Sequence, residues 1–183
     1  MNIFVLDESP IRAAQMQCDA HVVKMTLESA QMLSTAHRIL DGKQHKVKSK
    51  SGKTMVKSWV LPDERENVLY NAVHVNHPCT IWTCESAANY NWHYTHFKAL
   101  AEEYEYRYGK QHKSYIKLKD ILRPTPNKID KCVPTRFKLA MGAAPECIDY
   151  FDPIGSYRAF YKTKQARFKM VWTGRPIPEW FNE

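Results

Sequence analysis

Residues 19–40 read DAHVVKMTLESAQMLSTAHRIL and form the longest helical pattern near the start of the chain. At 100° per residue, apolar side chains cover most of the predicted helix, so we expect it to be buried on two sides. The remaining polar arc carries His21, Lys24, Glu28, Gln31, Thr35 and Arg38. Such a seam either faces water, with Lys24 and Glu28 forming an ordinary i,i+4 ion pair, or lines a pocket that holds a base, a cation and an acid.

Length and composition favour one domain. The 183 residues are 44% hydrophobic, which is enough for a full core. We predict a mainly α protein with a single compact helical domain over residues 1–183. It should include a short N-terminal strand over residues 1–6 and a small basic β-hairpin or arm over residues 43–58.

Further helices are predicted over residues 10–17, 63–73, 79–108 and 153–172. The helix over residues 79–108 carries Glu85, Asn89, His93 and His96 inside its apolar half. Buried polar groups need partners, so these residues form either an internal hydrogen-bond network or a functional pocket. In the last helix, Lys164 falls on the aromatic side, where it either snorkels to solvent or is desolvated in a site.

The charge of the chain points to a polyanionic partner. The net charge is +8, and residues 43–57 contain six lysines and no acid. This run is either a solvated loop or a phosphate-binding arm. We expect a nucleic acid, with DNA favoured, or a nucleotide as the partner. The candidate phosphate-binding residues are Lys46, Lys48, Lys50, Lys53, Arg158 and Lys162.

Several other classes of site are disfavoured. The i,i+3 histidine pairs at 74/77 and 93/96 lack an HExxH motif or paired cysteines, and the glycines are scattered singly. We therefore expect no metal and no other cofactor. The five cysteines include no CxxC pair, and no apolar run of about 18 residues or signal segment is present. These features predict a cytoplasmic protein with reduced thiols and no membrane partner.

Two polar helix faces supply the candidate catalytic residues. One carries His21, Lys24 and Glu28, and the other carries Glu85, Asn89 and His96. We predict that the two faces meet across one pocket, because polar groups on otherwise apolar helices satisfy one another at the lowest cost. A DNA glycosylase needs such parts: a carboxylate, an amine if it is also a lyase, cations for phosphate, and aromatic rings for a flipped base.

The opening MNIFVLDESP, followed by a helix, and the later Asn76-His77-Pro78 resemble the pyrimidine-dimer DNA glycosylase family over about the first quarter of the chain. The resemblance implies a small helical enzyme that uses its own α-amine as the nucleophile and a helical glutamate as the catalytic acid. The best-known members expose a small residue after methionine removal, whereas Asn2 makes Met1 a poor substrate for that removal. The whole chain resembles uncharacterised proteins of tailed bacteriophages, which implies the cytoplasm of an infected bacterium.

Three hypotheses follow from the sequence. The first is a nucleic-acid-processing enzyme that excises or modifies a base. The second is an enzyme that acts on a small nucleotide or a nucleotide-derived signal. The third is a non-catalytic protein that binds DNA or a host factor.

Overall fold

The computed structural model describes residues 1–49 and 51–182, and the chain is mainly α-helical, as predicted. Its elements follow in the order α1 (Pro10–Gln15), α2 (Asp19–Asp41), β1 (Lys43–Lys48), β2 (Met55–Val60), α3 (Arg65–Val68), α4 (Pro78–Glu85), α5 (Ala87–Tyr108), α6 (Lys113–Leu118), the short 3₁₀ helix η1 (Pro145–Cys147), α7 (Pro153–Lys162), the 3₁₀ helix η2 (Thr163–Ala166) and α8 (Glu179–Asn182).

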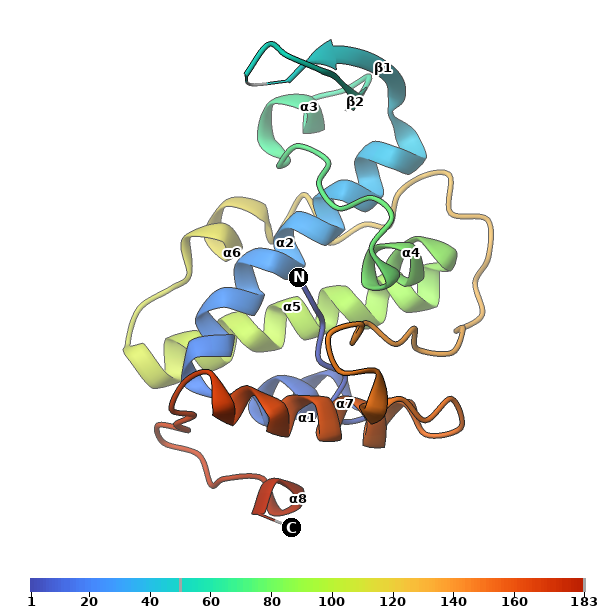
Figure 1. Cartoon of the computed structure of the whole chain (residues 1–183). Coiled ribbons are helices and arrows are strands. Elements are labelled where there is room, and N and C mark those ends of the chain that lie inside the picture. Colours follow the sequence, from blue (N-terminus) through green and yellow to red (C-terminus); the bar gives the residue numbers. More distant parts are fainter. Residues whose placement is uncertain (50, 183) are drawn as a thin grey trace.

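The two longest helices, α2 and α5, pack against each other at the centre of the molecule (Figure 1). Leu33 of α2 and Phe97 of α5 are fully buried in a cluster with Leu118 of α6. A larger cluster joins α2 to the N-terminal segment and to α7, and includes Phe4 and Tyr161. Burial of these apolar side chains on both sides of α2 is the main force that stabilises the arrangement.

The predicted hairpin is confirmed. Strands β1 and β2 pair in antiparallel register, with Lys43 opposite Val60 and Lys48 opposite Met55. The hairpin extends from the C-terminal end of α2, away from the helical body (Figure 1). The Arg38 side chain, which is 2% exposed, fixes its base by donating to the carbonyl oxygens of Trp59 (3.0 Å) and Tyr70 (2.6 Å) and by pairing with Glu66 (2.7 Å).

The predicted N-terminal strand is wrong. Residues 2–6 are buried but irregular, with a turn at Phe4, and in the part of the chain that the structure describes the hairpin is the only sheet. Side chains replace a partner strand in satisfying the backbone: Gln17 Nε2 donates to the Ile3 carbonyl at 3.1 Å. The Asn2 amide in turn donates to the Ala140 carbonyl at 2.7 Å. The segment is therefore held inside the helical body.

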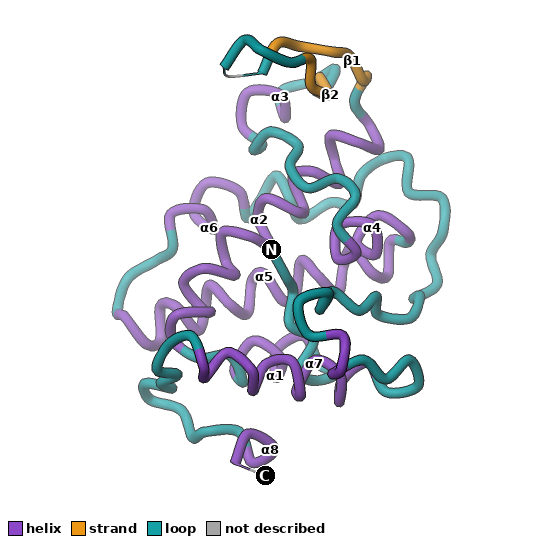
Figure 2. Tube along the Cα trace, viewed as in Figure 1, coloured by secondary structure: helices purple, strands orange, loops and turns teal. Residues whose placement is uncertain are grey.

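One predicted helix is divided in two, and two others are much shorter than expected. The helix over residues 79–108 is interrupted at Ser86, whose extended backbone and hydroxyl cap α5 by accepting from the Asn89 N–H at 3.1 Å. Residues 63–73 contain only the single turn α3, and the helix that begins at Pro153 ends at Lys162. The proline-rich stretch between α6 and α7 is irregular, as predicted, apart from η1 (Figure 2). Among the described residues, no helix has both the length and the apolar character needed to cross a bilayer.

Candidate functional site

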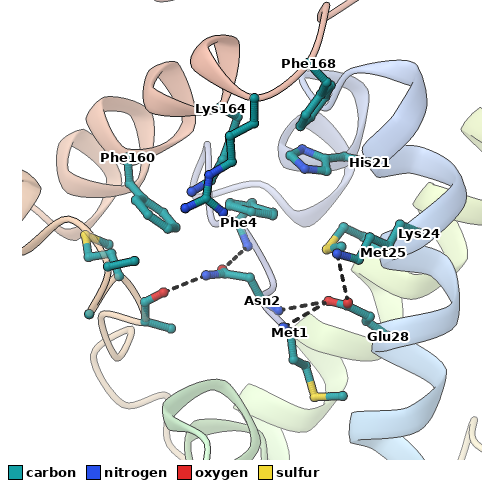
Figure 3. Close-up of a pocket in the computed structure, with 15 residues that line it drawn as sticks. Met1, Asn2, Phe4, His21, Lys24, Met25, Glu28, Phe160, Lys164 and Phe168 are labelled. Carbon is teal, nitrogen blue, oxygen red and sulfur yellow. Dashed lines mark hydrogen bonds and ion pairs between the residues drawn. The ribbon is translucent and has the colours of Figure 1, made fainter.

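A pocket of about 360 Å³ opens beside the N-terminal half of α2. Its walls come from four segments that are distant in sequence: residues 1–4, α2, the loop at 140–143, and the region from the end of α7 to residue 168. In Figure 3 the N-terminal segment lies between α2 on the right and Phe160 on the left, with Lys164 and Phe168 above it and Phe168 next to His21. The volume lies in the range of small-ligand sites.

Glu28 is the carboxylate of this pocket, and its side chain is 12% exposed. Its Oε2 atom accepts a 3.1 Å hydrogen bond from the backbone N–H of Asn2 and lies 3.7 Å from the α-amino group of Met1. Its Oε1 atom lies 3.6 Å from Nζ of Lys24. The Lys24–Glu28 ion pair expected from the sequence is therefore present. It lines a pocket, and the α-amino group of Met1 lies beside the same carboxylate.

His21 lies about two turns before Glu28 on the same face of α2 and is 6% exposed. Its ring stacks on Phe4, with centroids 4.8 Å apart, and Nδ1 lies 2.8 Å from the Tyr161 hydroxyl. Burial, reinforced by the positive charges of Lys24 and Lys164, lowers the pKa of His21 to about 4. The imidazole is therefore neutral near pH 7 and is a weak proton acceptor, so its expected role as a base is not supported.

Phe4 shapes the floor of the pocket with an unusual backbone. Its φ of 53° lies in the left-handed region, which is uncommon for a bulky residue. The Asn2 side chain holds this turn by accepting from the Phe4 N–H at 2.8 Å. The turn places the ring between His21 and Phe160, so surrounding packing maintains local strain at the site.

The wall opposite Glu28 carries two cations that were not among the candidate site residues. Lys164 lies on η2 and is 8% exposed, and Arg167 follows one turn later. The Lys164 ammonium lies 3.3 Å from the centre of the Phe160 ring. The position of Lys164 among aromatic residues was the sequence signal for this wall, whereas no pattern indicated Arg167.

The prediction that Glu85, Asn89 and His96 face Glu28 across one pocket is wrong, because none of the three lines it. Glu85 pairs with Lys138 at 2.7 Å and accepts from the Thr135 hydroxyl at 2.7 Å. The Asn89 amide donates to that same hydroxyl oxygen at 2.7 Å and to the Trp82 carbonyl at 2.8 Å. These contacts tie α4 and α5 to the loop at 135–138.

His96 is fully buried behind the N-terminal segment. Its ring nitrogens lie 2.8 Å from the Pro10 carbonyl oxygen and 3.2 Å from that of Ile3. Burial lowers the pKa of His96 to about 4. The second polar face is thus the internal network that the sequence left open as an alternative, and it supports the pocket only indirectly.

The basic residues are divided between the hairpin and α7. Side chains alternate between the two faces of a hairpin, and directly opposed residues share a face. Lys46, Lys48 and Lys57 therefore lie on one face, all exposed, and Lys43 lies on the other. Among the described residues, none of these lysines has an ion-pair partner.

The remaining candidates differ in position. Lys53 is exposed in the turn of the hairpin, and Lys50 lies outside the described residues. Arg158 is engaged within the protein, since Nε donates to the Leu6 carbonyl at 2.9 Å and the guanidinium lies 5.5 Å from the Trp180 ring centre. Lys162 is partly buried near the end of α7 and does not line the pocket.

Within residues 1–49 and 51–182, no three histidine, cysteine, aspartate or glutamate side chains gather closely enough to hold a metal ion. The chemistry available in the pocket is that of one carboxylate, an α-amine, a neutral imidazole and three side-chain cations. No protein-family model, curated protein sequence or solved structure matches this chain.

Proposed function

We propose that the protein is a phage-encoded enzyme that excises a base from DNA, with Glu28 as the catalytic carboxylate. The observation that carries this proposal is the position of Glu28, which lies beside an amine at one end of a pocket rich in cations. A carboxylate next to an amine is the pair that base excision through a covalent amine intermediate requires. This arrangement also agrees with the roles that the resemblance to pyrimidine-dimer glycosylases implies.

In the proposed reaction, the unprotonated α-amine attacks C1′ of the target nucleotide. The glycosidic C1′–N bond breaks, and the base leaves with the bonding electrons and takes a proton from water. Glu28 accepts a proton from the new secondary ammonium group and then donates it to O4′ as the C1′–O4′ bond opens, which leaves an iminium ion. The hydroxide left by that water then adds to the iminium carbon, and the adduct breaks down to the abasic aldehyde and the free amine.

The hairpin favours a polymer over a mononucleotide as the substrate. Glu28 lies thirteen positions before Asp41, the last residue of α2 ahead of the hairpin, which corresponds to about 20 Å at 1.5 Å per residue. This length equals about six base pairs of duplex, so a free nucleotide in the pocket would not reach the hairpin lysines. Lys46 also lies directly opposite Lys57, and two like charges in this position are stabilised by an anionic partner.

The test is an excision assay on duplex oligonucleotides that each carry one oxidised, alkylated, deaminated or ultraviolet-dimerised base. Mass spectrometry would detect the released base or the strand that carries an abasic site. The same bases supplied as nucleoside monophosphates form the second arm. Release from duplex alone supports the proposal, and release from the monophosphates alone supports the small-nucleotide hypothesis. Tight DNA binding without release in either arm supports a non-catalytic binding protein.

A further inference from the structure

The Lys164 side chain is largely buried, while its ammonium nitrogen keeps some contact with solvent and has no anionic partner among the described residues. In the described part of the chain, no carboxylate forms an ion pair with its ammonium and no acceptor forms a hydrogen bond with it. Lysine is almost never this buried unless it is paired, because desolvation of the charge is costly. The Phe160 ring compensates for only part of that cost. Burial and the nearby charge of Arg167 lower the pKa of Lys164.

Arg167 adds a second positive charge to the same wall of the pocket. Its side chain has no ion pair within residues 1–49 and 51–182. Cys147 lies close enough to influence Lys164 electrostatically, but burial raises the pKa of its thiol, so it supplies no anion at neutral pH. Arg167 is exposed, so the largely buried Lys164 and the solvent-facing Arg167 together present two positive charges that attract an anion to this wall of the cavity.

We propose that Lys164 and Arg167 form a phosphate subsite of the pocket. The inference rests on the proposed function, in which the bound group is the phosphodiester next to the target nucleotide. Arginine offers phosphate two parallel hydrogen bonds, and lysine offers a compact point charge. A phosphate held on this wall directs the attached sugar toward the opposite wall, where Glu28 and the α-amine lie (Figure 3).

If Lys164 binds the phosphate of a ligand, removing its charge should have opposite effects on the stability of the free protein and on ligand binding. Replacing Lys164 with Met keeps the aliphatic stem and removes the buried charge, so the free protein should become more stable. The same change should weaken binding of phosphate-containing ligands. If Lys164 had a purely structural role, Lys164→Met would lower the stability of the protein without specifically weakening ligand binding.

The experiment uses the whole protein and a duplex with one tetrahydrofuran abasic-site analogue, which binds but contains no base to excise. Fluorescence anisotropy would give Kd for the wild type, for Lys164→Met and for the control Lys98→Met. We expect Kd to rise about tenfold in Lys164→Met, as for loss of a charge-assisted hydrogen bond. We expect less than about a twofold change in Lys98→Met, because Lys98 is an exposed residue of α5 that does not line the pocket.

A second duplex replaces the phosphodiester beside the analogue with a neutral methylphosphonate. This change should weaken wild-type binding by a similar factor and should have no further effect on Lys164→Met. Additive effects of the two changes, or an unchanged Kd in Lys164→Met, would overturn the subsite. If either result were obtained while the protein still excised bases from duplex DNA, the proposed function would stand and only the phosphate subsite would be overturned.

Inorganic phosphate is the third probe and separates the two proposals. Its binding would be followed by NMR of the Lys164 side chain. If the protein excises no base but binds inorganic phosphate, and Lys164→Met abolishes that binding, the subsite stands and the proposed function fails. If the protein binds neither inorganic phosphate nor the abasic duplex, the subsite is overturned.

Discussion

The backbone N–H of Asn2 donates a 3.1 Å hydrogen bond to Oε2 of Glu28. The α-amino group of Met1 lies 3.7 Å from the same oxygen atom. A free amine on either residue would therefore lie beside this carboxylate, so the proposed chemistry does not depend on whether Met1 is removed. Asn2 and Glu28 are 26 positions apart in the sequence, and they meet because the N-terminal segment packs along α2.

Glu28→Gln should reduce base excision by at least about 10²-fold, because the amide cannot transfer the proton that the carboxylate transfers. Glu85→Gln is the matched control, since Glu85 is also a partly buried, lysine-paired glutamate but lies outside the pocket. Its turnover should equal that of the wild type. Single-turnover rates on the best duplex substrate measure both effects, and equal rates for the two variants would remove Glu28 from the reaction.

Replacing Lys46, Lys48 and Lys57 together with Gln should reduce the salt dependence of DNA binding. Each phosphate contact contributes about one unit to the slope of log K against log salt concentration, so the slope should fall by about three. The control is Lys43→Gln, on the opposite face of the hairpin. Anisotropy titrations across a range of salt concentrations give the slope. An unchanged slope in the triple variant would show that the hairpin does not contact the backbone of DNA.

Stability should fall between about pH 6.5 and pH 4, because burial lowers the pKa values of His21, His37 and His96 to about 4. In this window the unfolded chain binds protons that the folded protein does not, so acidification favours unfolding. At pH 5 the loss relative to pH 7 is on the order of 2 kcal/mol for each histidine. Urea unfolding at several pH values would measure it. A free energy of unfolding that is flat from pH 7 to pH 5 would contradict the burial of neutral imidazoles.

Arg38→Ala should destabilise the protein by about 3 to 5 kcal/mol, because it leaves Glu66 and several carbonyl groups at the base of the hairpin without their buried partner. Arg12→Ala is the control, since its guanidinium is exposed although it pairs with Asp7 at 2.9 Å. That change should cost less than about 1 kcal/mol. Denaturant unfolding measures both values, and equal losses would mean that Arg38 does not fix the hairpin.

The sequence predicted the elements whose local signals agree with their packing. The apolar periodicity of residues 19–40 gave α2 to within one residue, and the alternation around Ser51-Gly52 gave the hairpin. The predicted N-terminal strand failed because the Gln17 and Asn2 side chains, instead of a neighbouring strand, form hydrogen bonds with the buried backbone of Ile3 and Phe4. No local pattern distinguishes these two ways of pairing a buried backbone.

Half of the predicted site depended on contacts that the sequence does not encode locally. His21, Lys24 and Glu28 share one helix face, so their common pocket follows from helical periodicity. Glu85 and Asn89 are polar residues on a buried helix as well, but their partner is Thr135, 46 or more positions away in an irregular loop. Arg167 reaches the pocket only because α7 ends at Lys162 and the chain turns. Long-range packing therefore decides which polar face becomes a site.

The most direct test of the proposed chemistry is reductive trapping with borohydride. The protein would be mixed with a duplex that contains a true abasic site, and peptide mass spectrometry would locate the cross-link after mass analysis of the intact protein has identified its first residue. We predict a secondary amine between the sugar and the α-nitrogen of Met1, or of Asn2 if Met1 is removed, with little product in Glu28→Gln. A cross-link at Lys24 or Lys164, or no cross-link at all, would contradict the assignment of the α-amine and Glu28 as the reacting pair.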